Sequence, residues 1–133
     1  MPVSGLNHFT IRCAVSELDA LNDFYTRVVG LVPGKRPDIP APGTWLYAGG
    51  QAIVHLYAYL ETPEAAAPGP VTGPLDHISF RGHDLAATRA HLRAQGVAVA
   101  EAPVPGWPIH QLFLHDPKGI KIELTFFLDE EQA

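Results

Sequence analysis

Two pairs of polar residues stand at corresponding places in the two halves of this 133-residue chain. His8 and His77 are 69 positions apart (77 minus 8), and His55 and Glu123 are 68 apart (123 minus 55). Imidazole nitrogens and carboxylate oxygens are ligands that proteins use for Zn, Fe, Ni, Mn and Co. If the four positions converge, they predict a site for one divalent metal ion, with His8, His55, His77 and Glu123 as its ligands.

The surroundings of His55 and Glu123 make these residues unusual. Each stands in the middle of an apolar strand pattern, at 53–57 and at 121–125. A carboxylate in such a place either faces water or needs a partner. Any one of the four residues alone is explained by a solvent-facing or hydrogen-bonded side chain, so the metal hypothesis depends on their occurrence together.

An internal repeat would position these residues. Segments 6–12 and 75–81 both alternate apolar and polar residues, as half-buried strands do, and each has His third and Arg seventh. A helical pattern with a candidate N-cap and a terminal glycine follows each strand, from Ser16 to Gly30 and from Asp84 to Gly96. Two hairpins complete the repeats, at 45–59 around Gly49-Gly50 and at 109–127 around 116–119.

The repeat predicts an α+β fold of two tandem βαβββ modules within one domain, residues 1–133. We place module one at about 1–60, a linker rich in Pro, Ala and Gly at 61–72, and module two at about 73–133. Cys13 is the only cysteine, no signal-peptide pattern opens the chain, and a cytoplasmic location is expected. The net charge of -5 without a Lys/Arg cluster argues against nucleic-acid and membrane partners.

Short motifs over nearly the whole chain carry a family resemblance: Leu6-Asn7-His8, Asp23-Phe24-Tyr25 with Gly30-Leu31, Leu75-Asp76-His77, residues 113–119, and Ile122-Glu123-Leu124. They resemble the vicinal oxygen chelate superfamily, which includes glyoxalase I, bleomycin- and fosfomycin-resistance proteins, methylmalonyl-CoA epimerase and extradiol dioxygenases. The resemblance implies a half-open mixed β-barrel around a metal site, a small-molecule substrate, and a homodimer with sites shared across its interface.

The resemblance also implies roles for single residues. His8, His77 and Glu123 match the His, His, Glu metal set of the dioxygenases and fosfomycin-resistance enzymes. His55 matches the fourth position, which is Glu in glyoxalase I, and so departs from that two-carboxylate set. Thr10 is similar to a substrate-contacting Thr, and Phe113 stands where extradiol dioxygenases place a catalytic Tyr.

Further substrate contacts follow from strand alternation. Arg12 and Arg81 are in phase with His8 and His77 and either bind a substrate carboxylate or reach solvent. Four aromatic residues form either a pocket wall or ordinary core: Trp45, Tyr47, Tyr57 and Phe113. Alternation with Phe113 favours Gln111 over His110 as the residue facing the site, unless a bulge intervenes.

Three functions remain open at this point. The first is a metal-dependent lyase or isomerase that stabilises an enolate on adjacent substrate oxygens, with Glu123 or His55 moving the proton. The second is an Fe(II) dioxygenase of the extradiol type, with His8, His77 and Glu123 as its ligands. The third is a non-catalytic drug-binding resistance protein, a class that characteristically lacks these ligands.

Overall fold

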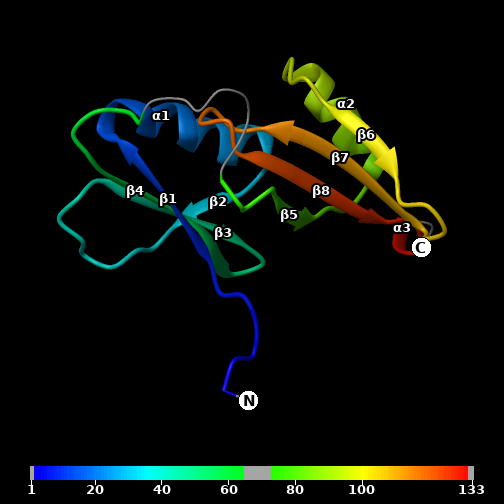
Figure 1. The fold of residues 1–133 in the computed structure, drawn as a ribbon, viewed down its shortest axis with the longest axis horizontal. Coiled ribbons are helices and arrows are strands. Elements are labelled where there is room, and N and C mark those ends of the chain that lie inside the picture. Colours follow the sequence, from blue (N-terminus) through cyan, green and yellow to red (C-terminus); the bar gives the residue numbers. More distant parts are fainter. Residues whose placement is uncertain (1, 65–72, 132–133) are drawn as a thin grey trace. The chain divides into compact units, whose positions relative to one another are not determined.

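The computed structural model describes residues 2–64 and 73–131, which belong to two compact units, Met1–Ala65 and Ala66–Ala133 (Figure 1). Each unit has the element order βαβββ, so the predicted α+β class and its two modules are confirmed. Most of the predicted linker, residues 65–72, lies outside the described residues.

Unit 1 contains one four-stranded sheet in the order β1-β4-β3-β2. Its elements are β1 (Phe9–Ala14), α1 (Val15–Asp23), the π-helical turn η1 (Phe24–Val28), β2 (Val32–Gly34), β3 (Gly43–Ala48) and β4 (Gln51–Leu60). The first strand pairs in parallel with β4, and the other pairs are antiparallel. The predicted hairpin turns at Gly49-Gly50, where both residues have positive φ angles of 57° and 81° that glycine adopts without steric cost.

The helix of unit 1 begins one residue before the predicted N-cap. Glu17 Oε1 accepts the backbone N–H of Ala14 at 3.0 Å, so Ala14 occupies the N-cap position and Ser16 lies inside α1. The helical turns continue through η1 to Gly30, whose φ of 93° ends them as predicted. The face turned to the sheet is buried at Leu21, Phe24, Tyr25 and Val28.

Unit 2 repeats this topology, with the sheet order β5-β8-β7-β6. Its elements are β5 (Ile78–Arg81), α2 (Leu85–Ala94), β6 (Ala100–Pro103), β7 (Ile109–His115), β8 (Lys121–Phe127) and α3 (Leu128–Glu131). Asp84 caps α2 as predicted, because its side chain accepts the N–H of Ala87. The carboxylate of Glu131 also binds the N–H groups of Asp84 and Leu85.

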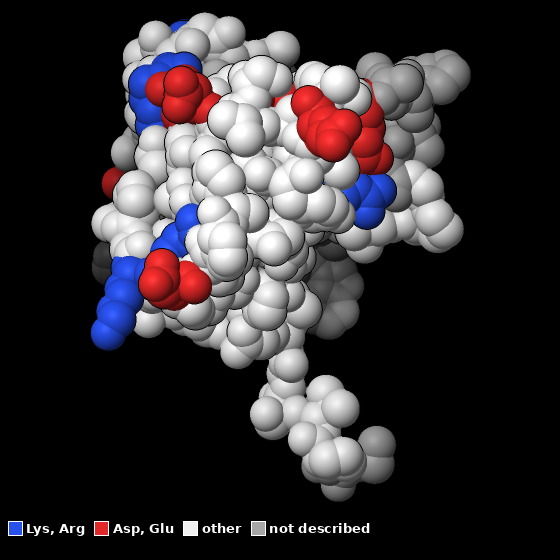
Figure 2. All heavy atoms as spheres, turned by 90° about the vertical axis from the view of Figure 1, so that its left-hand side faces the viewer, with Lys and Arg blue, Asp and Glu red and all other residues white. Residues whose placement is uncertain are grey.

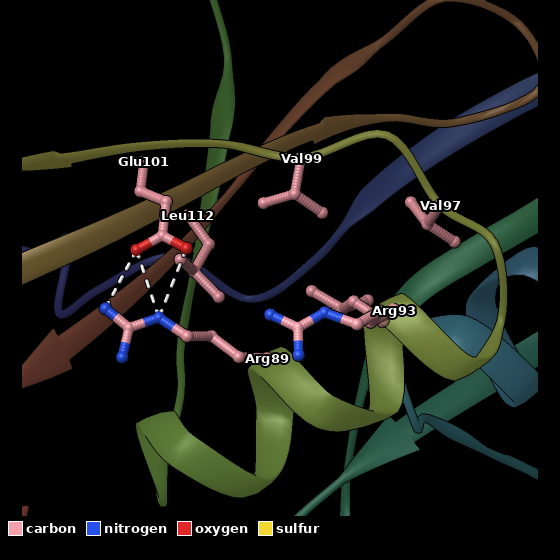
Figure 3. Close-up of a pocket in the computed structure, with 7 residues that line it drawn as sticks. Arg89, Arg93, Val97, Val99, Glu101 and Leu112 are labelled. Carbon is pink, nitrogen blue, oxygen red and sulfur yellow. Dashed lines mark hydrogen bonds and ion pairs between the residues drawn. The ribbon is translucent and has the colours of Figure 1, made fainter.

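The packing of α2 differs from that of α1. Of the residues in α2, only Leu92 is buried. A cavity of about 210 Å³ lies between α2 and β6, lined by Arg89, Leu92, Arg93, Val97, Val99, Glu101 and Leu112. Figure 3 shows the guanidinium of Arg89 donating to both carboxylate oxygens of Glu101, at 2.8 to 3.1 Å. This ion pair therefore joins α2 to β6 across one side of the cavity.

Charged side chains on the face drawn in Figure 2 lie among a majority of uncharged ones, with acidic and basic groups side by side. Within unit 1, Arg27 and Asp23 form an ion pair at 2.8 Å. No helix within residues 2–64 or 73–131 has the length and apolar character needed to cross a bilayer.

Candidate metal site

The first pair of candidate ligands belongs to unit 2. His77 precedes β5 and Glu123 lies in β8, with His77 Nε2 3.3 Å from Glu123 Oε1. That distance is longer than a normal N–H···O hydrogen bond of about 2.9 Å. Two ligands that each lie about 2.1 Å from one tetrahedral ion stand roughly 3.4 Å apart. The spacing of the two atoms therefore suits a shared metal ion.

Glu123 is held by directed hydrogen bonds although only 6% of it is exposed. Its Oε2 accepts the hydroxyl of Ser79 at 2.8 Å and that of Thr125, and its Oε1 accepts the amide N–H of Gln111 at 3.1 Å. Strand register explains the convergence, because Ser79 pairs with Glu123 across β5 and β8, and Gln111 pairs with Thr125 across β7 and β8. The buried carboxylate is thus hydrogen-bonded and fixed in orientation.

His77 is oriented by the residue before it. Its Nδ1 lies 2.7 Å from Asp76 Oδ2, and a carboxylate oxygen can only accept, so Nδ1 carries the proton. In the neutral ring, Nε2 is then the nitrogen with the lone pair, and it is the one that lies toward Glu123. A carboxylate fixes the tautomer of ligating histidines in metal sites in the same way. This hydrogen bond, with a smaller contribution from the charge of Lys121, lowers the pKa of Asp76.

The second pair of candidate ligands belongs to unit 1 and is a stack of rings. His55 lies between His8 and Trp45, with 3.8 Å between ring centroids on each side and interplanar angles of 17° and 8°. Thr10 and Trp45 both pair with His55 in the strand register and so project from the same face of the sheet. The structure thus brings together four residues that the sequence singled out.

Hydrogen bonds also set the tautomers of this pair. His8 Nδ1 lies 2.8 Å from Asn7 Oδ1, so in the neutral form of the ring Nε2 has the lone pair. His55 Nε2 donates to the carbonyl of Ala52 at 3.1 Å, which leaves Nδ1 with the lone pair. Burial, and next the nearby charge of His8, lower the pKa of His55. His55 is therefore a neutral imidazole near pH 7, the form that ligates metals.

Each unit thus supplies two donor groups of a kind that suits a divalent ion. Within either unit, the described residues gather no group of three His, Cys, Asp or Glu side chains. The donor types suit a divalent metal ion. The stacked rings of His8 and His55, 3.8 Å apart, do not direct their in-plane lone pairs at one point in this structure. The convergence of all four ligands remains a prediction.

The two predicted arginines are engaged in ion pairs. Arg12 Nε and Nη2 donate to the carboxylate of Glu64 at 2.6 and 3.1 Å, which raises the pKa of Arg12. Arg81 pairs with Glu130, and its guanidinium lies 4.1 Å from the ring centroid of Phe127. A role for either arginine in binding a substrate carboxylate would have to compete with these partners.

The remaining predicted residues divide between two faces of their strands. Gln111 points to Glu123 as alternation predicts, whereas His110 Nε2 lies 2.8 Å from Glu101. Phe113 pairs in register with Glu123 and shares its face. Of the other two predicted wall residues, Tyr47 donates its hydroxyl to the carbonyl of Lys35, and Tyr57 packs on Tyr59.

Four residues that lie around the unit 2 ligands were assigned no role from the sequence: Ser79, Thr125, Asp76 and Lys121. The signal for the first two is their alternation, since Ser79 stands two residues after His77 and Thr125 two residues after Glu123. The role of Asp76 has a weaker signal in its place directly before a candidate ligand.

Comparison with known families identifies the superfamily of this chain. The model of the Glyoxalase/Bleomycin resistance protein/Dioxygenase superfamily matches residues 5–124. The chain belongs to this superfamily, as the resemblance of its motifs predicted.

One relative and two solved structures are similar to this chain over most of its length. Glyoxylase I 4 of Arabidopsis thaliana is 33% identical over 126 residues, which are 92% of this chain and 70% of the relative. A glyoxalase/dioxygenase from Nostoc punctiforme superposes with a TM-score of 0.74 at 18% identity, over 92% of this chain and 90% of the other. Lactoylglutathione lyase from Agrobacterium tumefaciens gives 0.67 at 22% identity, over 95% and 96%. The two structures support the fold.

Proposed function

We propose that this chain is a divalent-metal-dependent enzyme of the glyoxalase type, a lyase or isomerase that moves a proton on a small substrate with adjacent oxygens. The observation that carries the proposal is the pairing of His77 Nε2 with the hydrogen-bonded, buried carboxylate of Glu123. The similarity to Glyoxylase I 4 supports the class of reaction.

The residues of both units have defined parts in this proposal. A bound divalent ion would act as a Lewis acid for two neighbouring oxygens of the substrate. His8, His55, His77 and Glu123 would hold it. Asn7 and Asp76 hydrogen-bond to Nδ1 of His8 and His77, respectively, and so favour the tautomer in which Nε2 can bind the ion. The ion is therefore expected to be Zn, Fe, Ni, Mn or Co, one per site.

Glu123 is the proposed base. Its carboxylate is the only one among the four ligands, and Ser79, Thr125 and Gln111 fix its two oxygens in place. A carboxylate so positioned accepts a proton from a carbon next to a carbonyl without reorienting. His55 is the second candidate base, because burial and His8 keep it unprotonated near pH 7.

Metal analysis tests the proposal first. We expect His8→Ala, His77→Ala and Glu123→Ala each to lose stoichiometric metal, and His55→Ala to lose less. Glu101→Ala is a matched control, because Glu101 is a strand carboxylate bound to Arg89 and His110 and projects from the opposite face of the sheet to Glu123. Full metal occupancy in Glu123→Ala would contradict the four-ligand site.

A dioxygenase is the second candidate, because His8, His77 and Glu123 form a two-histidine, one-carboxylate set. Incubation of the iron-loaded protein with catechols in an oxygen electrode separates the two reactions. Oxygen uptake would favour the dioxygenase. Exchange of a substrate C–H proton with deuterated solvent, without oxygen uptake, would favour the lyase or isomerase. If an apolar aromatic compound binds tightest, and binds equally well to metal-free protein, the protein is instead a drug-binding protein.

The homodimer implied by the family resemblance is part of the same proposal. Light scattering at micromolar concentration should give twice the mass of the 14.4 kDa chain. A monomeric mass would contradict it.

A further inference from the structure

A second cavity in unit 2 lies beside the candidate ligand pair. Its volume is about 450 Å³, and its lining residues are Ala98, Val99, Ala100, Phe113, His115 and Lys121. All of them come from β6, β7, β8 or the residues just before β6. The lining therefore combines small apolar residues and one phenyl ring with the imidazole of His115 and the ammonium of Lys121.

Strand register puts this cavity on the same face of the sheet as Glu123. Phe113 pairs with Ala100 on one side and with Glu123 on the other, and His115 pairs with Lys121. Residues directly opposite each other in a ladder project from one face. Lys121 precedes Glu123 by two residues, so its Cα is about 6.5–7 Å away on that face. A ligand held at Glu123 would thus extend over Phe113 toward Lys121.

The ammonium of Lys121 is partly desolvated and only loosely paired. Its Nζ lies 4.9 Å from the ring centroid of Phe113 and 3.7 Å from Asp76 Oδ2. The same oxygen of Asp76 accepts the much shorter hydrogen bond of His77 at 2.7 Å. An ammonium has three N–H donors, and a contact of 3.7 Å is too long for a good hydrogen bond. Lys121 can therefore bind a further anionic acceptor.

The two arginines in phase with the candidate histidines, Arg81 and Arg12, are more strongly engaged than Lys121. Arg81 follows Ser79 on the His77 face of β5 but pairs with Glu130 at the far end of the strand. Arg12 of unit 1 pairs with Glu64 through two hydrogen bonds. Lys121 differs from both in standing two residues from a candidate ligand and in lining a cavity.

We propose that this cavity is a substrate subsite for an apolar or aromatic group that carries a carboxylate, and that Lys121 is the residue selecting anionic substrates. The inference rests on the proposed function, because it assumes that adjacent oxygens of the substrate are held at the metal by His77 and Glu123. The ring or acyl body would lie against Phe113, where Ala98 and Ala100 leave room, and the carboxylate would bind Nζ of Lys121.

Two catechols of matched shape test the charge preference. The probes are 3,4-dihydroxybenzoate and 4-methylcatechol, titrated calorimetrically into zinc-loaded protein. Lys121→Met keeps the apolar stem and removes the charge. We expect the ratio of the two affinities to fall about tenfold in this variant, the change that a charge-assisted hydrogen bond produces. Comparing ratios cancels the different acidity of the two catechols.

Three further variants define the outcome. Lys121→Arg should retain the ratio, and Lys118→Met should leave it unchanged, because Lys118 lies in the turn after β7 and does not line the cavity. Ala98→Leu narrows the cavity and should weaken both catechols without loss of zinc. The subsite would be overturned if Lys121→Met kept the wild-type ratio of affinities. It would also be overturned if Ala98→Leu bound both catechols as tightly as the wild type.

Titrating the same probes into metal-free protein separates the two proposals. If neither affinity depends on zinc, the metal-dependent function fails, while a ratio that still falls in Lys121→Met upholds the subsite. If both affinities need zinc but Lys121→Met does not change the ratio of the two catechol affinities, the subsite fails and the metal-dependent function stands.

Discussion

The two units share one topology but use their helices differently. In unit 1, α1 and η1 bury Leu21, Phe24, Tyr25 and Val28. In unit 2, α2 buries only Leu92, and the ion pair of Arg89 with Glu101 borders a cavity below the helix. The order and direction of the strands are the same in both units. The sheet ladder therefore preserves the positions of the candidate ligands, while the helix behind it is free to vary.

The two candidate ligand pairs also differ between the units, in the contacts that hold them. His8 and His55 form an aromatic stack with Trp45, whereas His77 and Glu123 belong to a network of directed polar contacts. Only the second pair contains a charged ligand with fixed oxygens. We infer that unit 2 contributes more of the metal affinity and that unit 1 contributes shape and neutral donors.

The strongest test of this difference compares one ligand from each unit. Glu123→Gln removes the only negative ligand while keeping its size, and we expect zinc affinity to fall more than 100-fold. His55→Ala should reduce it by about tenfold, because three ligands remain. Competition with a chromogenic chelator measures both values. Equal losses would show that the two pairs contribute alike.

Helix packing gives the next largest effect. Leu21→Ala should lower the free energy of unfolding by about 3–4 kcal/mol, because Leu21 is fully enclosed. Leu92→Ala should cost about 2 kcal/mol, since Leu92 already borders a cavity and loses fewer contacts. Urea denaturation followed by circular dichroism measures the difference. A larger loss for Leu92 would mean that α2 is the better packed helix.

A smaller effect is expected from the residues that orient the histidines. Asp76→Ala should weaken zinc binding by roughly 10-fold or more, because the carboxylate fixes the tautomer of His77 and increases its basicity. Asn7→Ala should weaken it only a few-fold, since a neutral amide polarises His8 less. The chelator assay applies here too, and equal effects would argue against a charge contribution from Asp76.

The smallest effect concerns acid stability. Hydrogen bonds from Arg89, and next from His110, lower the pKa of Glu101 to about 2. The unfolded chain has the ordinary value of about 4.3, so Glu101 stabilises the fold fully above that pH and loses its contribution as the pH falls through 2. Glu101→Gln should lower Tm slightly at pH 7, and the difference from wild type should vanish near pH 2. A difference that grows in acid would contradict the shift.

The repeat made the architecture predictable from sequence, but not every strand in it. The hairpins and the cap at Asp84 have clear local patterns, and the structure confirms them. In contrast, β2 contains Val-Pro-Gly and β6 contains Ala-Glu-Ala-Pro, and these residues favour strands poorly. Both are edge strands, which hydrogen bonds to one neighbour define. Their positions follow from the sheet rather than from their own sequences.

Some contacts of the candidate site were also predictable from sequence, and others were not. Strand alternation predicted that Gln111 rather than His110 faces the site, because orientation along a regular ladder depends on local spacing. In the structure Gln111 donates to Glu123. The partner of Arg12 could not be found in this way, since Glu64 is 52 positions away and beyond the strand pattern. Pairings between side chains of distant segments depend on the folded chain. The joint ligation of one ion by all four residues remains a prediction.

The cap that Glu131 places on α2 has a consequence for folding during synthesis. Leu85 and Glu131 are 46 residues apart, and a ribosome adds about 5–20 residues each second. The first turn of α2 therefore waits roughly 2–9 seconds for this carboxylate after it has been made. During that interval the side chain of Asp84 is available to cap the helix, whereas the Glu131 carboxylate is not. Translation speed through β6, β7 and β8 thus sets how long α2 stays only half capped.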